Sequence, residues 1–338
     1  MREAARAAHD CYSFGLREDP WQRRLEARIA EMVGKEDALI FPTCSMANTT
    51  AMMLHASPGS RVLVQPSAHV LSSEAGAASA IAGVMLSEVG ENACDIDPAV
   101  PSLESWERAM LPEADPLRPP VRLCVIENTH TRAGGAAIGV AYCEALVALA
   151  AERGISCHLD GARLFYAGAV LGVSVADLSG GFETVSLSLN KAFGAPIPAM
   201  LAGSRAAIER ALVIRQRLGG GMRPVGPACA ASLAGLEDMA HFQRIHALAA
   251  RLRAGLGACA LLEAEWPEAP TNVVVARVRS AESSTSLVRR LESCGLLALP
   301  LGGQRIRFVV YRGIEAGHIE RAIAIVQQLV SMPESDRN

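Results

Sequence analysis

The stretch TVSLSLNKAFGAP (184–196) leads from an apolar run into a lysine and then into a Gly-Pro loop. Residues 184–190 are predicted to form a buried strand, because a short apolar run bounded by turn residues is typical of parallel sheets. Lys191 follows directly, and it is one of two lysines among 32 lysine and arginine residues, the other being Lys35. Taken alone, a charged side chain at a strand end most often forms an ion pair or is exposed. Arginine would serve for either purpose, so the lysine indicates chemistry that needs an amine.

Further apolar runs share this pattern and alternate with alanine-rich helical segments. The other predicted strands are ALIFP (38–42), RVLVQP (61–66), VRLCVIEN (121–128) and ISCHLD (155–160). Helices are predicted over 144–153 and over 19–34, where Asp19 is the N-cap and Pro20 lies in the first turn. This alternation predicts an α/β fold with a mainly parallel sheet covered on both sides.

The pattern changes after about residue 235. There we expect helices over 236–256 and 284–294, strands over 271–278 and 305–311, and a last helix with an apolar stripe that includes Ile319 and Val326. The chain is therefore predicted to have two domains. Residues 1–235 form an N-terminal arm plus a large α/β domain, and residues 236–338 form a smaller α+β domain.

Composition excludes several classes of protein. A net charge of −3 gives no basic surface for nucleic acid, and no apolar stretch is long enough to span a bilayer. No positively charged segment followed by an apolar one opens the chain, so secretion is not expected. The nine cysteines include no CxxC pair. They indicate reduced thiols of a cytoplasmic protein, and no metal site is predicted.

Lys191 and Asp160 are expected to face the same crevice. Ligands bind beyond the carboxyl ends of the strands in an open parallel sheet, where Asp160 ends one predicted strand and Lys191 follows the next. A desolvated lysine can lose its proton and attack a carbonyl, which arginine cannot do. Pyridoxal phosphate is the best-known cofactor that binds through such an imine, and it also needs a carboxylate against its ring nitrogen. Asp160 can supply that carboxylate.

Six collinear motifs then make a family resemblance specific. They are KEDALIFPTCSMAN (35–48), AHVLSSEAG (68–76), ENTHTRAGG (127–135), HLDGARLFYAGAVLGVS (158–174), SLSLNKAFGAP (186–196) and RLGGGMRPVG (217–226). In this order they resemble the threonine aldolase and β-eliminating lyase family of fold-type-I pyridoxal phosphate enzymes. The resemblance implies an aspartate aminotransferase-like fold, with the cofactor bound by the large domain.

The resemblance also implies roles for individual residues. Lys191 matches the Schiff-base lysine, and Asp160 the partner of the pyridine nitrogen. His69 matches the histidine stacked on the cofactor ring, and His130 a second active-site histidine; either imidazole has a suitable pKa to take the proton of a β-hydroxyl group. Which histidine acts is left open.

The remaining assignments are residues expected to bind anionic groups of the cofactor or the substrate. Thr43, Cys44 and Ser45 match the phosphate-binding turn, with cysteine where the family usually has glycine. The others are Arg163 beside the cofactor's phenolic oxygen and the substrate, Arg223 as a phosphate or interface contact, and Arg307 as the ligand of the substrate carboxylate. Arg305 lies on the same face as Arg307 and is the alternative.

The function implied is cleavage of a threonine-like β-hydroxy-α-amino acid to glycine and an aldehyde. The alternatives are β-elimination or dehydration, or racemisation, at the same cofactor, and a non-catalytic relative that keeps the fold as a binding module. The resemblance further implies a homodimer or homotetramer acting on a small amino acid.

Overall fold

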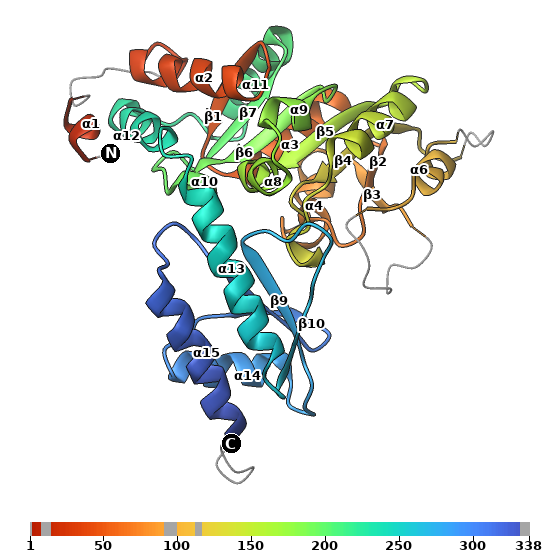
Figure 1. Ribbon diagram of the computed structural model, residues 1–338. Coiled ribbons are helices and arrows are strands. Elements are labelled where there is room, and N and C mark those ends of the chain that lie inside the picture. The colour runs from red at the N-terminus through yellow and green to blue at the C-terminus, as the bar shows by residue number, and fades with distance from the viewer. Residues whose placement is uncertain (1, 8–14, 91–99, 112–116, 332–338) are drawn as a thin grey trace. The chain divides into compact units, whose positions relative to one another are not determined.

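The computed structural model describes residues 2–7, 15–90, 100–111 and 117–331 (Figure 1). They divide into two compact units, one made of residues 1–129 and 138–239 and the other of residues 130–137 and 240–338. The predicted domain boundary after residue 235 stays a prediction.

The first unit is built on a seven-stranded sheet in the order β1-β7-β6-β5-β4-β2-β3. The strands are β1 (Asp37–Phe41), β2 (Arg61–Val64), β3 (Met85–Glu88), β4 (Val121–Glu127), β5 (Ser156–Gly161), β6 (Thr184–Ser188) and β7 (Ala199–Gly203). The five strands from β3 to β6 pair in parallel, whereas β7 is antiparallel to both β6 and β1. All residues of β6 and β7 are buried, so helices cover both faces there. The predicted fold class is confirmed, and β7 is the one strand of the seven that runs in the opposite direction.

The helices of the first unit connect these strands. They are α1 (Arg2–Ala7), α2 (Pro20–Met32), α3 (Cys44–His55), α4 (His69–Ser72), α5 (Ala77–Ala80), α6 (Leu103–Met110), α7 (Val140–Ala151), α8 (Leu164–Leu171), α9 (Val175–Ser179), α10 (Leu189–Phe193), α11 (Arg205–Arg217) and α12 (Gly226–Leu236). Helix α2 begins as predicted, since the Asp19 side chain accepts hydrogen bonds from the amides of Trp21 and Gln22.

The second unit holds a four-stranded antiparallel sheet in the order β10-β11-β9-β8. Its elements are η1 (Thr131–Ala133), α13 (His241–Gly257), β8 (Leu262–Ala264), β9 (Val273–Val278), α14 (Ser284–Ser293), β10 (Leu299–Gly302), β11 (Arg305–Val309) and α15 (Ala316–Ser331). The helix predicted over 236–256 corresponds to α13 and begins five residues later than predicted, whereas α12, which ends at Leu236, was not predicted. Ile319 and Val326 of α15 are buried, as their spacing predicts.

A buried ion cluster joins α2 to β1. Arg17 Nε donates to Glu26 Oε2 at 2.7 Å, and its two terminal nitrogens donate to the carboxylate of Asp37 at 2.7 and 2.6 Å. Glu26 is fully buried, and its other oxygen accepts from Gln22 Nε2 and from the amide of Ile40. Burial raises the pKa of Glu26, and the charge of Arg17 opposes that shift. Arg17 therefore offsets part of the cost of burying the Glu26 carboxylate.

Replacing Arg17 with methionine is expected to destabilise the protein by about 3 kcal/mol at pH 8, because a buried charge loses its partner. The loss should be smaller at pH 5. The pKa of Glu26 is already raised in the folded state and would rise further without Arg17, so the penalty present at high pH disappears as Glu26 takes up a proton. Urea unfolding at both pH values measures the difference.

Arg28→Met is the matched control for this experiment. Arg28 lies on α2, the helix that carries Glu26, and pairs with Glu31 at 2.6 Å, but both side chains are at least half exposed. Its loss should change stability by no more than about 0.5 kcal/mol. An Arg17→Met loss that is equal at pH 5 and pH 8 would contradict the assigned role of Glu26.

Candidate active site

The carboxyl ends of β4, β5 and β6 bring the chemically active groups together. Glu127 is the last residue of β4, Asp160 is next to last in β5, and Lys191 lies in α10 just after β6. The predicted strand over 184–190 ends two residues early, because the chain turns into α10. The buried Tyr166 hydroxyl donates to the carbonyl oxygen of Lys191 at 3.2 Å, which fixes the backbone that carries the amine. Gly161 is required beside β6, since a Cβ there would lie 2.8 Å from the carbonyl oxygen of Ser186.

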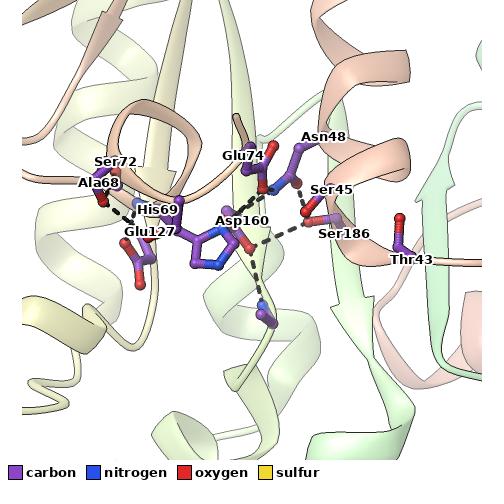
Figure 2. A network of polar contacts seen from close by, with 12 residues as sticks. Thr43, Ser45, Asn48, Ala68, His69, Ser72, Glu74, Glu127, Asp160 and Ser186 are labelled. Carbon is purple, nitrogen blue, oxygen red and sulfur yellow. Dashed lines mark hydrogen bonds and ion pairs between the residues drawn. The ribbon is translucent and has the colours of Figure 1, made fainter. Parts of the chain in front are cut away.

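Asp160 is a buried carboxylate held by donors (Figure 2). Asn48 Nδ2 donates to Oδ2 at 3.0 Å, and the amide of Ala162 donates to Oδ1 at 3.3 Å. Burial raises the pKa of Asp160 to about 6, and the negative charges of Glu127 and Glu74 add to the shift. The positive charges of His69 and Lys191 oppose it. The site thus carries excess negative charge that a cation beside Asp160 would offset.

A chain of hydrogen bonds positions Asn48. Burial lowers the pKa of His158 to about 3, so its ring is neutral and carries one N–H. Its Nε2 lies 3.1 Å from Asn48 Oδ1, and its Nδ1 lies 3.0 Å from the carbonyl oxygen of Thr184 and 2.9 Å from the Thr184 hydroxyl. The Thr184 hydroxyl in turn lies 3.1 Å from His55 Nε2.

The groups around its amide decide what Asn48 offers to the site. Its oxygen accepts from the Ser186 hydroxyl at 2.6 Å and lies beside His158 Nε2, so its NH₂ group faces two carboxylates. Asn48 Nδ2 donates to Glu74 Oε1 at 2.9 Å as well as to Asp160. The amide is therefore fixed in one orientation, which favours the ionised form of Asp160.

His69 begins the short helix α4 and is held by two carboxylates (Figure 2). Its backbone amide donates to Glu127 Oε2 at 2.8 Å, and its Nδ1 lies 2.9 Å from Glu74 Oε1. The hydrogen bond to Glu74 raises the pKa of His69. Because Nδ1 donates to Glu74 in the neutral ring, the lone pair is on Nε2, which is the atom able to accept a proton.

Ligand atoms of His69, Glu74 and Asp160 all lie within 4.8 Å of one another. The hydrogen bonds just described already engage each of these groups: His69 bonds Glu74, and Asn48 bridges Glu74 to Asp160. The cluster is therefore accounted for by protein contacts, and the absence of a metal stays a prediction.

Thr43, Cys44 and Ser45 lie at the amino end of the 12-residue helix α3. The Thr43 hydroxyl accepts from the amide of Met46 at 3.1 Å, and the turn carries the partial positive charge of the helix end. Cys44 is buried, and burial raises the pKa of its thiol to about 12, so this cysteine is an inert packing group. A helix end of this kind suits a phosphate dianion.

The two arginines predicted for the first unit differ in burial. Arg163 is buried at the start of α8, and burial lowers its pKa. The charges of Glu127, Tyr166 and Asp160 raise the pKa of Arg163 again, so the guanidinium interacts electrostatically with the site around Asp160. Arg223 is exposed in the loop before α12, and its contact to a phosphate or to another subunit stays a prediction.

His130, Arg305 and Arg307 belong to the second unit. His130 is buried, and its Nδ1 accepts from the amide of Ala133 at 3.3 Å. Arg305 makes a bidentate ion pair with Glu265 at 2.7 and 2.6 Å. Because this guanidinium is already paired, Arg307 is the better candidate for binding a substrate carboxylate. The roles of Arg307 and of His130 stay predictions.

Comparison with known proteins decides the family. The sequence profile of the β-eliminating lyases matches residues 1–279. The chain belongs to the β-eliminating lyase family. It is 34% identical over 325 residues to low-specificity L-threonine aldolase 1 of Arabidopsis thaliana, which covers 94% of this chain and 90% of that protein.

Solved structures share the fold of this lyase. The threonine aldolase of Leishmania major superposes with a TM-score of 0.78 at 20% identity, covering 97% of this chain and 95% of that one. A serine palmitoyltransferase from S. paucimobilis, solved with bound PLP, superposes with a TM-score of 0.74 at 17% identity, covering 96% of this chain and 82% of that one. The chain is a lyase that depends on pyridoxal 5′-phosphate (PLP).

The residues of the first unit fit this cofactor. Asp160 is a buried carboxylate among other carboxylates, and a protonated ring nitrogen is the cation that would offset their charge. Lys191 presents an amine close enough to lower the pKa of Asp160, and the end of α3 suits the phosphate. We therefore expect Lys191, Asp160 and the Thr43–Ser45 turn to hold PLP.

The roles of Asn48, Glu74, His158 and Ser186 were not found by sequence reasoning. All four residues belong to motifs that carry the family resemblance: Asn48 ends one, Glu74 lies within a second, and His158 and Ser186 begin two others. Their place in these motifs was the signal that could have found them. Their function depends on contacts between segments up to 138 residues apart, which the sequence pattern does not show.

Proposed function

We propose that this lyase cleaves the Cα–Cβ bond of a threonine-like β-hydroxy-α-amino acid, giving glycine and an aldehyde. The observation that carries the proposal is the placement of His69 beside the Lys191–Asp160 site, with its Nδ1 bonded to Glu74 and its Nε2 able to take a proton. The resemblance to a threonine aldolase along 94% of the chain supports the same reaction.

Each residue of the site has a part in this proposal. PLP, when bound, draws off the electron pair that bond cleavage leaves on Cα. Lys191 would hold the cofactor covalently through Nζ, and Asp160 would keep a proton on the ring nitrogen. Arg163 supplies positive charge beside Asp160 and Glu127.

Cleavage also requires the substrate's β-hydroxyl to lose its proton. His69 can accept that proton at Nε2, and the Glu74 carboxylate would then stabilise the charged ring. His130 remains the other candidate. A predicted homodimer or homotetramer and a cytoplasmic location are parts of the same proposal. No helix in the described part of the chain combines the length and apolar character needed to cross a membrane.

The second candidate is elimination of the β-substituent, the activity after which the family is described. It would use the same Lys191 and Asp160 but would break a Cβ–X bond instead of Cα–Cβ. A base that takes a proton from the β-hydroxyl favours cleavage, because elimination needs that oxygen to leave rather than to become a carbonyl. The products therefore distinguish the two reactions.

Incubation of the PLP-saturated protein with L-threonine and with β-phenylserine is expected to give glycine plus acetaldehyde or benzaldehyde in equal amounts. The aldehyde is measured by coupled reduction and glycine by amino-acid analysis. Release of ammonia and a keto acid without glycine would show elimination and would replace the proposal. Conversion of the substrate to its Cα epimer with neither product would show racemisation at Cα.

A further inference from the structure

The short helix α4, which begins at His69, has no side-chain cap of its own. Its N-cap residue is Ala68, whose methyl group cannot accept a hydrogen bond. Amides in the first turn of a helix have no partner within the helix, so the His69 amide needs an acceptor from another part of the chain. Glu127, the last residue of β4, supplies it, since its Oε2 accepts from this amide at 2.8 Å (Figure 2).

Glu127 and Gln65 bind the start of α4 through a reciprocal pair of hydrogen bonds. The Glu127 side chain accepts from the backbone of His69, and the Glu127 backbone amide donates to Gln65 Oε1. Gln65 is 0% exposed and Glu127 is 4% exposed, so water does not replace either bond. Because Gln65 and His69 are four residues apart, the two bonds attach the chain that leads into α4 to the end of β4.

The segment that begins with His69 lies between two residues of unfavourable backbone conformation. Ser67 precedes it with a φ of 57°, and Ala75 follows it with a φ of 51°. Residues other than glycine adopt this left-handed region when contacts from elsewhere in the structure fix the chain. Glu127 makes such a contact, and it is the register partner of Asp160 on β5. The position of His69 relative to Asp160 therefore depends on Glu127.

Glu127 also acts on the imidazole of His69 through its charge. The hydrogen bond to Glu74 raises the pKa of His69, burial lowers it, and the charges of Asp160 and Glu127 raise it again. These three carboxylates are the charged groups that face His69, from the segment after α4, from β5 and from β4. Removing the charge of Glu127 should therefore lower the pKa of His69.

We propose that Glu127 is a positioning residue, which holds His69 where its Nε2 can take the proton of the substrate's β-hydroxyl group. This inference rests on the proposed aldol cleavage and deepens it. Glu127 acts through the backbone of His69 and need not touch the substrate. Its loss should therefore impair proton transfer more than substrate binding, so that kcat falls while KM changes little.

Glu127→Ala is expected to lower kcat for cleavage of β-phenylserine about 30-fold, as for the loss of one charge-assisted hydrogen bond, with KM changed less than about twofold. Glu127→Gln keeps an oxygen that can accept from the His69 amide, so it should recover most of this loss. It also removes the negative charge. Because His69 accepts the proton in its neutral form, the acid limb of the kcat/KM profile should move to lower pH.

Proton NMR of the histidine rings in the cofactor-free protein measures the pKa of His69 without any reaction. The His69 signal is identified by its loss in His69→Gln. We expect the pKa of His69 to be lower in Glu127→Gln than in the wild-type protein. This shift does not depend on which bond the enzyme breaks, so failure of the proposed reaction is distinguishable from failure of this inference.

Glu88→Gln is the matched control. Glu88 on β3 accepts from the amide of Ser67 at 2.6 Å, two residues before His69, but this carboxylate is exposed and water can replace it. The variant should keep the wild-type kcat and the wild-type pKa of His69. Glu127→Gln fills nearly the same space as the native residue, so it serves as the test if Glu127→Ala does not fold.

Three results would each overturn the proposal. The first is an unchanged pKa of His69 in Glu127→Gln. The second is a loss of kcat in Glu88→Gln equal to that in Glu127→Ala. The third is a loss in Glu127→Ala that appears in KM rather than in kcat, or that Glu127→Gln does not recover, since a general loss of structure would produce either pattern.

Discussion

Replacing Lys191 with alanine is expected to reduce turnover at least about 1000-fold, because no other group in the site can supply the amine. The buried neighbours of Lys191 at the carboxyl ends of the strands are carboxylates, histidines and amides. The fold should survive, since Lys191 is only half-buried and the contact of Tyr166 is to its backbone oxygen. The variant should therefore be folded and inactive.

Borohydride reduction followed by mass spectrometry is the direct measurement. In the wild-type protein, the peptide containing residue 191 should gain the mass of the reduced cofactor, and the visible absorption of the holoenzyme should be lost in the variant. The chain offers a matched control in Lys35, the other lysine. Its Nζ donates to the carbonyl oxygens of Ser179 and Phe182 at 2.8 and 2.6 Å, so it is a structural cation. Label on Lys35, or label retained in Lys191→Ala, would contradict the assignment.

Asp160→Asn is expected to lower turnover by about 1000-fold while leaving covalent attachment of PLP at Lys191 intact. An amide has no negative charge with which to keep a proton on the ring nitrogen, so the electron-withdrawing power of the cofactor is lost. In either orientation, the new NH₂ group would also face one donor, from Asn48 or from Ala162, because these two groups bind different oxygens of Asp160. Asn48→Ala keeps the carboxylate and removes one donor, so its loss of turnover should be only about tenfold.

The free energy of unfolding of the cofactor-free protein is a second measurement on the Asp160→Asn variant. The folded pKa of Asp160 is raised to about 6, above its unfolded value, so its contribution to stability is present at low pH and is lost as the pH rises through 6. Between pH 7.5 and pH 5 the cofactor-free wild type should gain about 1 kcal/mol relative to Asp160→Asn. A parallel pH dependence of the two proteins would show that Asp160 is not the buried, charge-crowded group described above.

Four of the five parallel strands of the large sheet, β2, β4, β5 and β6, were predictable because each is a short, largely buried apolar run. β4 and β5 match the predicted strands to within a residue at each end. β3 was not predicted, because its residues are exposed or half-buried and do not form an apolar run. β7 was missed because the segment 199–203 follows closely on Lys191 and the Gly-Pro loop, and its antiparallel pairing with β6 needs only this short connection.

The sequence by itself determined the chemical groups of this protein: a lysine where arginine would otherwise stand, an aspartate at a neighbouring strand end, and the motifs that place both in one family. These follow from residue type and from periodicity within a few residues, which are local properties of the chain. Only the tertiary structure decided how those groups are tuned. Asn48 faces Asp160 across 112 residues of sequence, and Ser186 donates to Asn48 across 138. Strand register and burial set these distances, and the electrostatic effect of a buried charge depends on its neighbours in space rather than in sequence.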